Sequence, residues 1–169
     1  LHMPSAAKQK GNAWERDVAK DLSETFNENF IRVPNSGAYT GGANVFRIDQ
    51  LTEQQRRMMD GDIMVPPCLS RYKIECKNYK AFDFHQLFNE NKTLDKWIKQ
   101  AEFGLLWFLV IKVTRKGSFI LFRKEISKHF SYKNYLSYKD KYVITDYKEF
   151  WQENADAIRR LNEDSTIEL

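Results

Sequence analysis

The stretch RYKIECKNYK, residues 71–80, alternates apolar and charged residues in the manner of a short β-strand. Side chains along a strand point to opposite faces in turn, so Glu75 and Lys77 lie opposite Ile74 and Cys76. A charged face of this kind usually belongs to an edge or surface strand and is simply solvated. A glutamate and a lysine two residues apart can also serve a reaction, and the rest of the chain favours that interpretation.

Length and composition indicate one domain with a substantial core. The chain has 169 residues, 42% hydrophobic and 14% aromatic. Its longest apolar run, GLLWFLVI at 104–111, is too short to cross a bilayer, and no signal peptide is visible. Cys68 and Cys76 lack the spacing of zinc ligands, so we interpret them as reduced packing residues. We therefore expect a cytoplasmic protein with no membrane partner.

Charge is distributed unevenly along the chain. Between Lys112 and Lys141 there are nine Lys or Arg and two acids, whereas the segment from Asp146 onward has seven acids and three bases. Within the basic segment, SYKNYLSYKDKY at 131–142 interleaves tyrosines with lysines, which suits contacts to nucleic-acid backbone and bases. The alternatives are an ordinary solvated surface and a helix whose tyrosines pack on the core.

The order of elements predicts an α/β fold with a mixed central β-sheet flanked by helices. LLWFLVIKV is apolar on both faces, as a central strand should be, and SFILF follows it as a hairpin partner. The expected elements are a helix at 5–26, a strand at 30–33, a short helix within 52–61, strands at 62–65 and 71–77, a helix at 93–103, strands at 105–113 and 116–122, and a helix at 147–161.

The first helix carries one acid on its apolar side. At 100° per residue, Glu15 falls inside the arc formed by Trp14, Val18, Leu22 and Phe26, while the other charged residues fall outside it. A buried carboxylate is costly unless it is paired or binds a metal. Glu15 is therefore either a functional residue, a partner in a structural ion pair, or a side chain that reaches solvent near the helix start.

A second acid precedes the strand at 71–77. A return of the chain from GDIMV, 61–65, through PPCLS would place Asp62 beside Glu75. The alternative is a turn aspartate, a role that fits Asp60 better because it precedes the glycine.

These residues resemble a known signature. Gly61-Asp62 followed by Glu75-Cys76-Lys77 resembles the (P)D…(D/E)xK motif of a large nuclease superfamily, although glycine replaces the proline. The helix KGNAWERDVAKDL, with Glu15, resembles the first helix of archaeal-type Holliday junction resolvases within it. RVPNSGA resembles their next strand and serine-bearing turn, and WIKQAE resembles a later helix that often carries a glutamine, here Gln100. The resemblance covers about Lys10 to Val113, and the last third of the chain matches nothing in it.

The resemblance implies a restriction-endonuclease-like core, αβββαβ, with a C-terminal helical extension. We expect residues 1–9 to be a tag remnant and helix lead-in, residues 10–125 to form the nuclease core, and residues 126–169 to add a basic, aromatic segment and a helix. The implied location is the cytoplasm of a bacterial, archaeal or phage-infected host cell.

The resemblance also implies a metal site for Mg²⁺ or Mn²⁺, which prefer hard oxygen ligands. Its ligands would be Asp62, Glu75 and the backbone carbonyl of Cys76, with Glu15 beside them or holding a second ion. Lys77 would orient or deprotonate the attacking water and stabilise the phosphate. The implied catalytic residues are Glu15, Asp62, Glu75, Lys77 and Gln100. The expected DNA-binding residues are Asn35, Ser36, Tyr39, Arg115 and Lys116.

The implied function is structure-selective cleavage of branched or duplex DNA without a small-molecule cofactor. Symmetric cutting of a junction calls for a homodimer, and we expect GLLWFLVI, SFILF, Phe150 and Trp151 to supply its interface, unless they are all intramolecular core. Alternatives are another nuclease of the same fold (restriction-type, repair, nicking or phage DNA-degrading) and a non-catalytic DNA-binding module.

Overall fold

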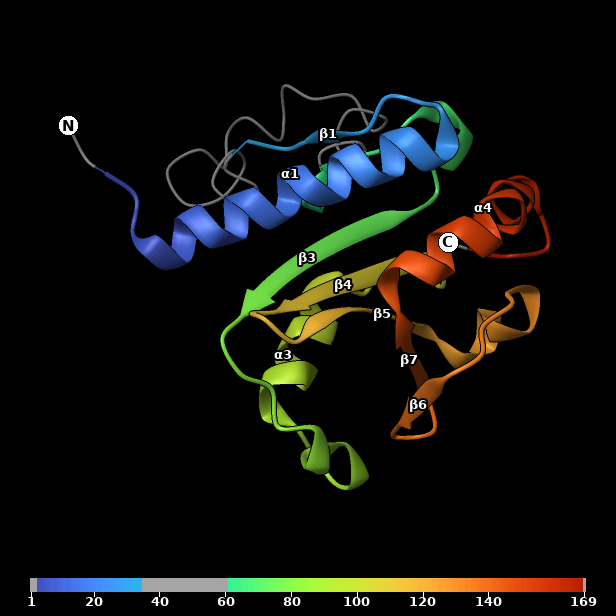
Figure 1. Ribbon diagram of the computed structural model, residues 1–169. Helices are drawn as coiled ribbons and strands as arrows, with labels where there is room; N and C mark the ends of the chain where they lie inside the picture. The colour runs from blue at the N-terminus through green and yellow to red at the C-terminus, as the bar shows by residue number, and fades with distance from the viewer. Residues whose placement is uncertain (1–2, 35–60, 169) are drawn as a thin grey trace, which may run out of the picture.

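The computed structural model describes residues 3–34 and 61–168, which form a mixed α/β structure (Figure 1). A five-stranded sheet carries helices on both faces, as the sequence predicts, and a two-stranded sheet lies beside α1. The short helix expected within 52–61 falls almost wholly outside the described residues. The elements are α1 (Ala6–Phe26), β1 (Ile31–Arg32), β2 (Ile63–Met64), η2 (Pro67–Leu69), β3 (Lys73–Tyr79), η3 (Phe84–Phe88), α3 (Lys92–Ala101), β4 (Trp107–Val113), β5 (Gly117–Arg123), η4 (Lys124–His129), β6 (Tyr135–Tyr138), β7 (Tyr142–Asp146) and α4 (Tyr147–Glu163).

The strand order of the larger sheet is β3-β4-β5-β7-β6. β3 and β4 are parallel, with Glu75 opposite Leu109, and the remaining neighbours are antiparallel. A parallel pair needs a crossover connection, which α3 supplies. Among the described residues, β3 is the outermost strand on its side of the sheet, so one of its edges faces away from β4.

Two apolar layers hold the helices to the sheet. On one face, Phe108 and Val110 of β4 join the buried stripe of α1 and the apolar side of α4. On the other face, Trp107, Leu109 and Ile111 pack beneath α3. This confirms both the central position of β4 and the apolar arc predicted for the first helix, because each face of the strand needs its own cover.

Each long helix begins with a side-chain cap, as the sequence pattern of such starts requires. Ser5, Asn91 and Asp146 accept hydrogen bonds from backbone N–H groups three residues further on, at 3.2, 2.9 and 3.0 Å respectively. α1 ends at Asn27, which adopts the left-handed conformation with φ of 51°. Across the described ranges, no helix combines the length and apolar character needed to cross a membrane.

The tyrosine-rich stretch at 131–142 contains the turn of a β-hairpin, so the helix considered as an alternative for it is wrong. Tyr138 and Tyr142 face each other across β6 and β7, and Lys141 N–H donates to the Tyr138 carbonyl at 3.1 Å. Lys139 and Asp140 in the turn have φ of 51° and 52°, as a type I′ turn requires. Neither is glycine or asparagine, which is why the turn was not recognised from sequence.

The predicted dimer interface is also wrong. Phe150 and Trp151 are 1% and 2% exposed and belong to an aromatic cluster around Phe108. GLLWFLVI is apolar on both sides because α1 and α4 cover one face of the sheet and α3 covers the other. The apolar residues of these segments therefore pack inside one chain.

We expect Trp151→Ala to lower the free energy of unfolding by about 3–5 kcal/mol, the usual loss when a large buried aromatic is truncated. Urea unfolding at two protein concentrations measures this, with Gln152→Ala, which alters an exposed residue of the same helix, as the control. A loss of unfolding free energy that depends on protein concentration would show that Trp151 lies in a subunit interface.

Candidate active site

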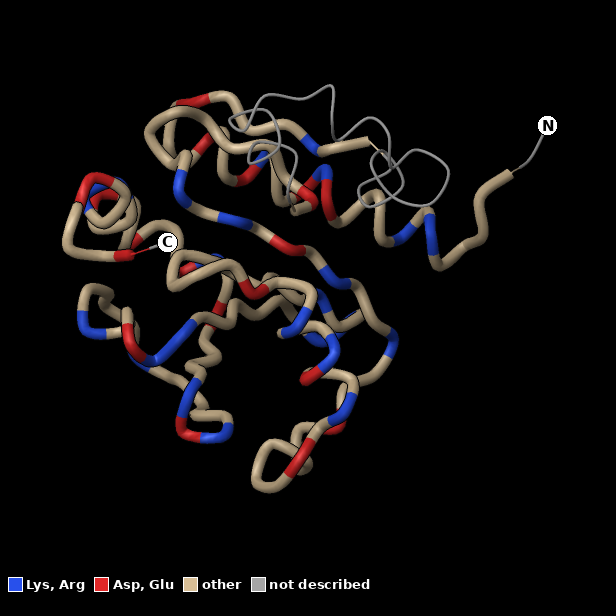
Figure 2. The backbone as a smooth tube through the Cα atoms, turned by 180° about the vertical axis from the view of Figure 1, so that it is seen from behind, with Lys and Arg blue, Asp and Glu red and all other residues tan. Residues whose placement is uncertain are grey.

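β3 presents Glu75 and Lys77 on the face opposite its core residues. Ile74 and Cys76 are buried against the α1 side of the sheet, whereas the Glu75 and Lys77 side chains keep 13% and 24% of their exposure. Figure 2 shows basic and acidic positions spaced along this part of the backbone with uncharged positions between them. The strand alternation expected from RYKIECK is confirmed.

Asp62 is held against the outer edge of β3 by backbone geometry. Its N–H donates to the Ile74 carbonyl at 3.0 Å, and its carbonyl accepts from Val33 N–H at 2.9 Å. Its Oδ2 atom accepts a hydrogen bond from Cys76 N–H at 2.7 Å. The side chain is buried, and the predicted placement of Asp62 beside Glu75 is confirmed.

Gly61 explains why proline does not precede Asp62 in this chain. Its φ of +96° is closed to proline, which is fixed near −65°. A Cβ at this position would lie 2.9 Å from the Ile74 carbonyl oxygen. The departure from the superfamily motif therefore follows from the close approach of this turn to β3.

Asp62 and Glu75 form a strained carboxylate pair. Burial, followed by repulsion from Asp62, raises the pKa of Glu75 to about 7. Lys77 acts in the opposite direction, with its Nζ atom 3.7 Å from Glu75 Oε1. Lys73 also lowers this pKa, so ionisation of the pair is opposed mainly by burial and by mutual repulsion, and a cation between the two carboxylates would relieve both.

Glu15 reaches the same region from α1. Arg32 Nε donates to Glu15 Oε2 at 2.5 Å, and Arg32 also bonds Asn12 Oδ1 at 2.7 Å. Burial and the charge of Asp62 nevertheless raise the pKa of Glu15. The structural ion pair considered from sequence is therefore present, and Glu15 is also an electrostatic neighbour of Asp62.

Cys76 lies at the centre of these acids. Burial, then Asp62, Glu15 and Glu75, raise the pKa of its thiol well above the usual value, so the side chain stays neutral. Its N–H bonds Asp62, and the N–H and C=O of one strand residue point to the same edge. The Cys76 carbonyl therefore faces the edge at which Asp62 lies.

The donors present suit a hard divalent ion, although no metal cluster is preformed. Asp62 and Glu75 offer carboxylate oxygens, and Cys76 offers a carbonyl at the same edge. Within residues 3–34 and 61–168, no three acidic, histidine or cysteine side chains converge closely enough to hold a metal ion. Glu15, the third acid, is drawn to Arg32 instead.

The other predicted residues are more scattered. Gln100 is exposed at the end of α3, where its backbone carbonyl accepts from Lys73 Nζ at 2.8 Å. Arg115 and Lys116 are exposed in the β4–β5 turn, which Thr114 N–H joins to the Tyr79 carbonyl at 2.9 Å. Asn35, Ser36 and Tyr39 lie outside the described residues.

Arg32 and Asn12 are the neighbours of the site that sequence reasoning missed. The signal was present, because an acid on the buried arc of a helix needs a basic partner from an adjacent element. Arg32 lies in the strand that follows the helix, and Asn12 precedes Glu15 by three residues on α1.

A family model described as phage putative PDDEXK endonuclease matches residues 6–167. The chain belongs to this family. The match includes α1, the Asp62 turn and β3, and it continues through α4, which the resemblance noted from sequence did not cover. The nuclease superfamily is thereby shown, whereas the archaeal resolvase branch is not. Neither the curated proteins nor the solved structures give a match.

We expect Glu75→Gln to stabilise the metal-free protein at pH 8. The folded pKa of Glu75, about 7, lies above its ordinary value of 4.5, so the folded state binds the extra proton. The resulting stability is present below pH 4.5 and is lost as pH rises through 7. At 1.36 kcal/mol per pKa unit, the gain in the variant at pH 8 is about 1–3 kcal/mol.

Urea unfolding in chelator between pH 5 and 8 measures this difference. Glu153→Gln, a change to an exposed residue of α4, is the matched control and should shift little. Equal stability of Glu75→Gln and wild type at pH 8 would show that Lys77 already neutralises the pair.

Proposed function

We propose that the chain is a Mg²⁺- or Mn²⁺-dependent endonuclease that hydrolyses phosphodiester bonds in DNA. The observation that carries this proposal is the hydrogen bond from Cys76 N–H to Asp62, which fixes a second carboxylate beside Glu75 and Lys77. Membership of the PDDEXK endonuclease family supports the reaction class.

Asp62, Glu75 and the Cys76 carbonyl would hold the metal, with Glu15 beside them. A bound divalent ion would supply Lewis-acid charge, which polarises the scissile phosphate and favours ionisation of the attacking water. The raised pKa of Glu75 supports this assignment, because ionisation of both acids becomes favourable when a cation is shared.

Lys77 would place its ammonium group beside the reacting phosphate. It lies on the same strand face as Glu75, and a positive charge there stabilises the negative charge that develops on the phosphate oxygens. The same position allows Lys77 to orient the attacking water or, once deprotonated, to accept its proton. Gln100 would act from α3 as a contact to substrate.

The finer expectations about fold and substrate also stand as proposals. The αβββαβ order is supported by the described elements α1, β1, β2, β3, α3 and β4, of which β1 and β2 pair as the small sheet. The resemblance to resolvases makes a four-way junction the first substrate to test. Symmetric cutting of a junction would require two chains, for which light scattering with and without DNA is the measurement.

We expect Asp62→Asn and Glu75→Gln to lose metal-dependent cleavage by at least about 100-fold while keeping DNA affinity, because metal ligands are removed and basic contacts remain. The assay uses four-way junction, flap, single-stranded and linear duplex DNA with Mg²⁺ or Mn²⁺. Asp156→Asn and Glu153→Gln, on α4, are the controls. Cleavage by either site variant at the wild-type rate would refute the assignment.

The variant Glu15→Gln distinguishes a functional role of Glu15 from a purely structural ion pair. The amide can still accept a hydrogen bond from Arg32, but it removes the charge beside Asp62. We expect cleavage to fall by about tenfold or more, with the melting temperature changed by only a few degrees. Glu24→Gln, on the exposed side of α1, is the control. A lower melting temperature with full activity per folded molecule would make Glu15 purely structural.

A further inference from the structure

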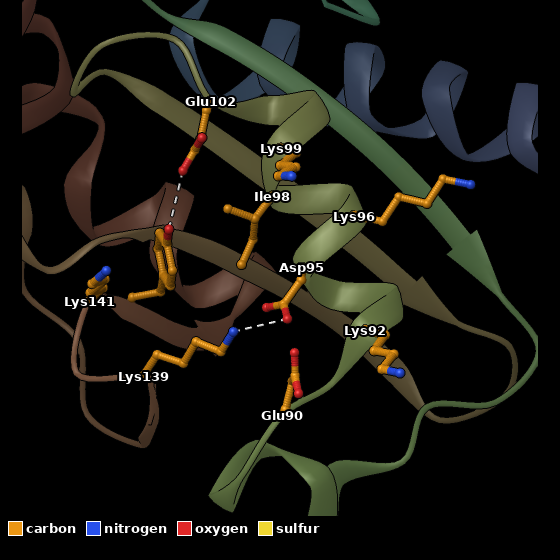
Figure 3. Close-up of a pocket in the computed structure, with 10 residues that line it drawn as sticks. Glu90, Lys92, Asp95, Lys96, Ile98, Lys99, Glu102, Lys139 and Lys141 are labelled. Carbon is orange, nitrogen blue, oxygen red and sulfur yellow. Dashed lines mark hydrogen bonds and ion pairs between the residues drawn. The ribbon is translucent and has the colours of Figure 1, made fainter.

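A hollow of about 640 Å³ lies between α3 and the turn joining β6 to β7, away from the carboxylate pair (Figure 3). In Figure 3, Asp95 of α3 points toward Lys139 of the turn, whereas the Lys96 side chain extends away from the turn. Three acids, including Asp95 and Glu102, contribute to its wall. Its lysines are Lys92, Lys96, Lys99, Lys139 and Lys141.

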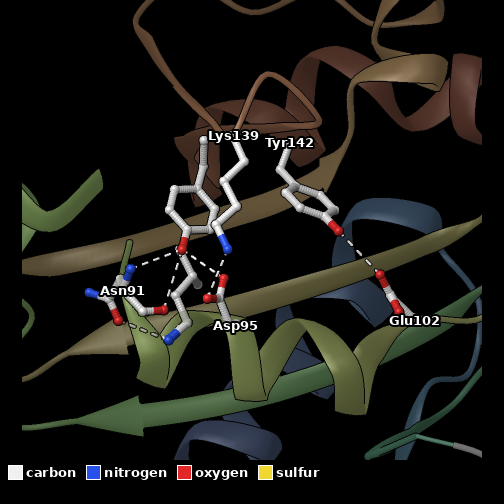
Figure 4. Close-up of polar contacts among 7 residues, drawn as sticks. Asn91, Asp95, Glu102, Lys139 and Tyr142 are labelled. Carbon is white, nitrogen blue, oxygen red and sulfur yellow. Dashed lines mark hydrogen bonds and ion pairs between the residues drawn. The ribbon is translucent and has the colours of Figure 1, made fainter. Parts of the chain in front are cut away.

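Two of the three acids at this hollow accept side-chain hydrogen bonds. Asp95 accepts from Lys139 Nζ at 2.9 Å and from the Tyr138 hydroxyl at 2.7 Å, and Glu102 accepts from the Tyr142 hydroxyl at 3.2 Å (Figure 4). Desolvation of Asp95 acts against ionisation, yet the hydrogen bonds from Tyr138 and Lys139 hold its pKa below the usual value. The described chain offers no ion-pair partner to the remaining lysines, which are Lys92, Lys96, Lys99 and Lys141. We call these four the lysine groove.

The two walls of the lysine groove are fixed to each other. The Tyr138 hydroxyl is buried and accepts from Asn91 N–H at 2.9 Å, at the start of α3. On the other side, the carbonyl of Lys141 accepts from Lys124 N–H at 2.8 Å. These contacts fix the backbone from which the lysines extend, which lowers the entropic cost of binding a polyanion there.

The lysine groove lies on the same side of the sheet as the reactive strand face. α3 covers the face opposite Ile74 and Cys76, which is the face that bears Glu75 and Lys77. α3 runs antiparallel to β3, since Lys73 Nζ bonds the Gln100 carbonyl at one end. At the other end, the Tyr79 and Trp97 rings are in contact at 5.4 Å.

We infer that the lysine groove binds the sugar–phosphate backbone of the DNA substrate, an inference that rests on the proposed endonuclease function. Lys92, Lys96 and Lys99 recur at one helical turn and span about 10 Å of the α3 axis. This is about three steps between successive phosphates on one strand of B-DNA. An acidic peptide has the same sign of charge, but the endonuclease family supplies nucleic acid as the substrate class.

The test is a charge reversal with a matched control. Lys92→Glu/Lys96→Glu/Lys99→Glu alters exposed side chains of α3, and Lys8→Glu/Lys20→Glu/Lys148→Glu makes the same charge change outside the groove, on α1 and at the start of α4. DNA binding is followed by fluorescence anisotropy in chelator over a range of salt, with circular dichroism to show that both variants fold. A Lys→Gln triple at 92, 96 and 99 serves as the milder variant.

We expect the groove variant to bind DNA at least about tenfold more weakly and to lose about 2–3 from the slope of log K against log salt, against a small change in the control. With wild-type metal-dependent cleavage as reference, its KM should rise while kcat at saturating DNA is retained. Equal DNA binding by the groove and control variants would overturn the inference. It would also be overturned if the wild-type protein bound a polyglutamate peptide as tightly as it binds DNA.

Failure of the inference and failure of the proposed function are distinguishable. If wild type cleaves DNA and the groove variant binds and cleaves like the control, DNA binding by the groove is refuted and the proposed endonuclease function stands. If wild type binds DNA through these lysines but hydrolyses nothing with Mg²⁺ or Mn²⁺, the endonuclease assignment is refuted and the binding surface stands.

Discussion

The hydrogen bond from Cys76 N–H to Asp62 Oδ2 is the contact on which the candidate site depends. It exists because β3 is the outermost strand, so its backbone groups on that edge can take a side chain in place of another strand. Edge strands are normally a liability that proteins cover or charge. Here the segment after Gly61 covers the edge. The Cys76 N–H of β3 then holds the Asp62 carboxylate beside Glu75.

That arrangement holds negative charge where burial opposes it, and the fold must offset the cost. Burial raises the pKa of both Glu75 and Glu15, which means that the metal-free site disfavours its own ionised form. The aromatic packing beneath the sheet, where Tyr72 stacks on Phe108 with ring centroids 5.3 Å apart, is one contribution to the stability that offsets this cost. Sites that bind a cation commonly show such local destabilisation, because the carboxylates are placed for the bound state.

Sequence reasoning reached the parts of the molecule that local pattern determines. The α1 stripe, the doubly buried β4 and the Asp62–Glu75 contact each follow from periodicity or from a short return of the chain. The β6–β7 hairpin was missed because its turn places Lys139 and Asp140 at positive φ without the usual glycine or asparagine. Trp151 was assigned to an interface because a sequence does not state how many helices cover a sheet. The Arg32–Glu15 pair joins two elements through side chains, so the sequence signals only that a buried Glu15 needs a partner and does not say which residue supplies it.

The crossover from β3 to β4 sets the spatial relation between the carboxylate pair and the lysine groove. Since α3 is the connection of a parallel strand pair, it must run back along β3, and the contacts of Lys73 with Gln100 and of Tyr79 with Trp97 show that it does. The lysines of α3 therefore lie alongside the strand that carries Glu75 and Lys77, and not beyond its end. A DNA backbone bound in the groove would run along α3, on the face of the sheet that also bears Glu75 and Lys77. Such a path suits an enzyme that cuts within a strand, since it requires no free end of the substrate to enter the site.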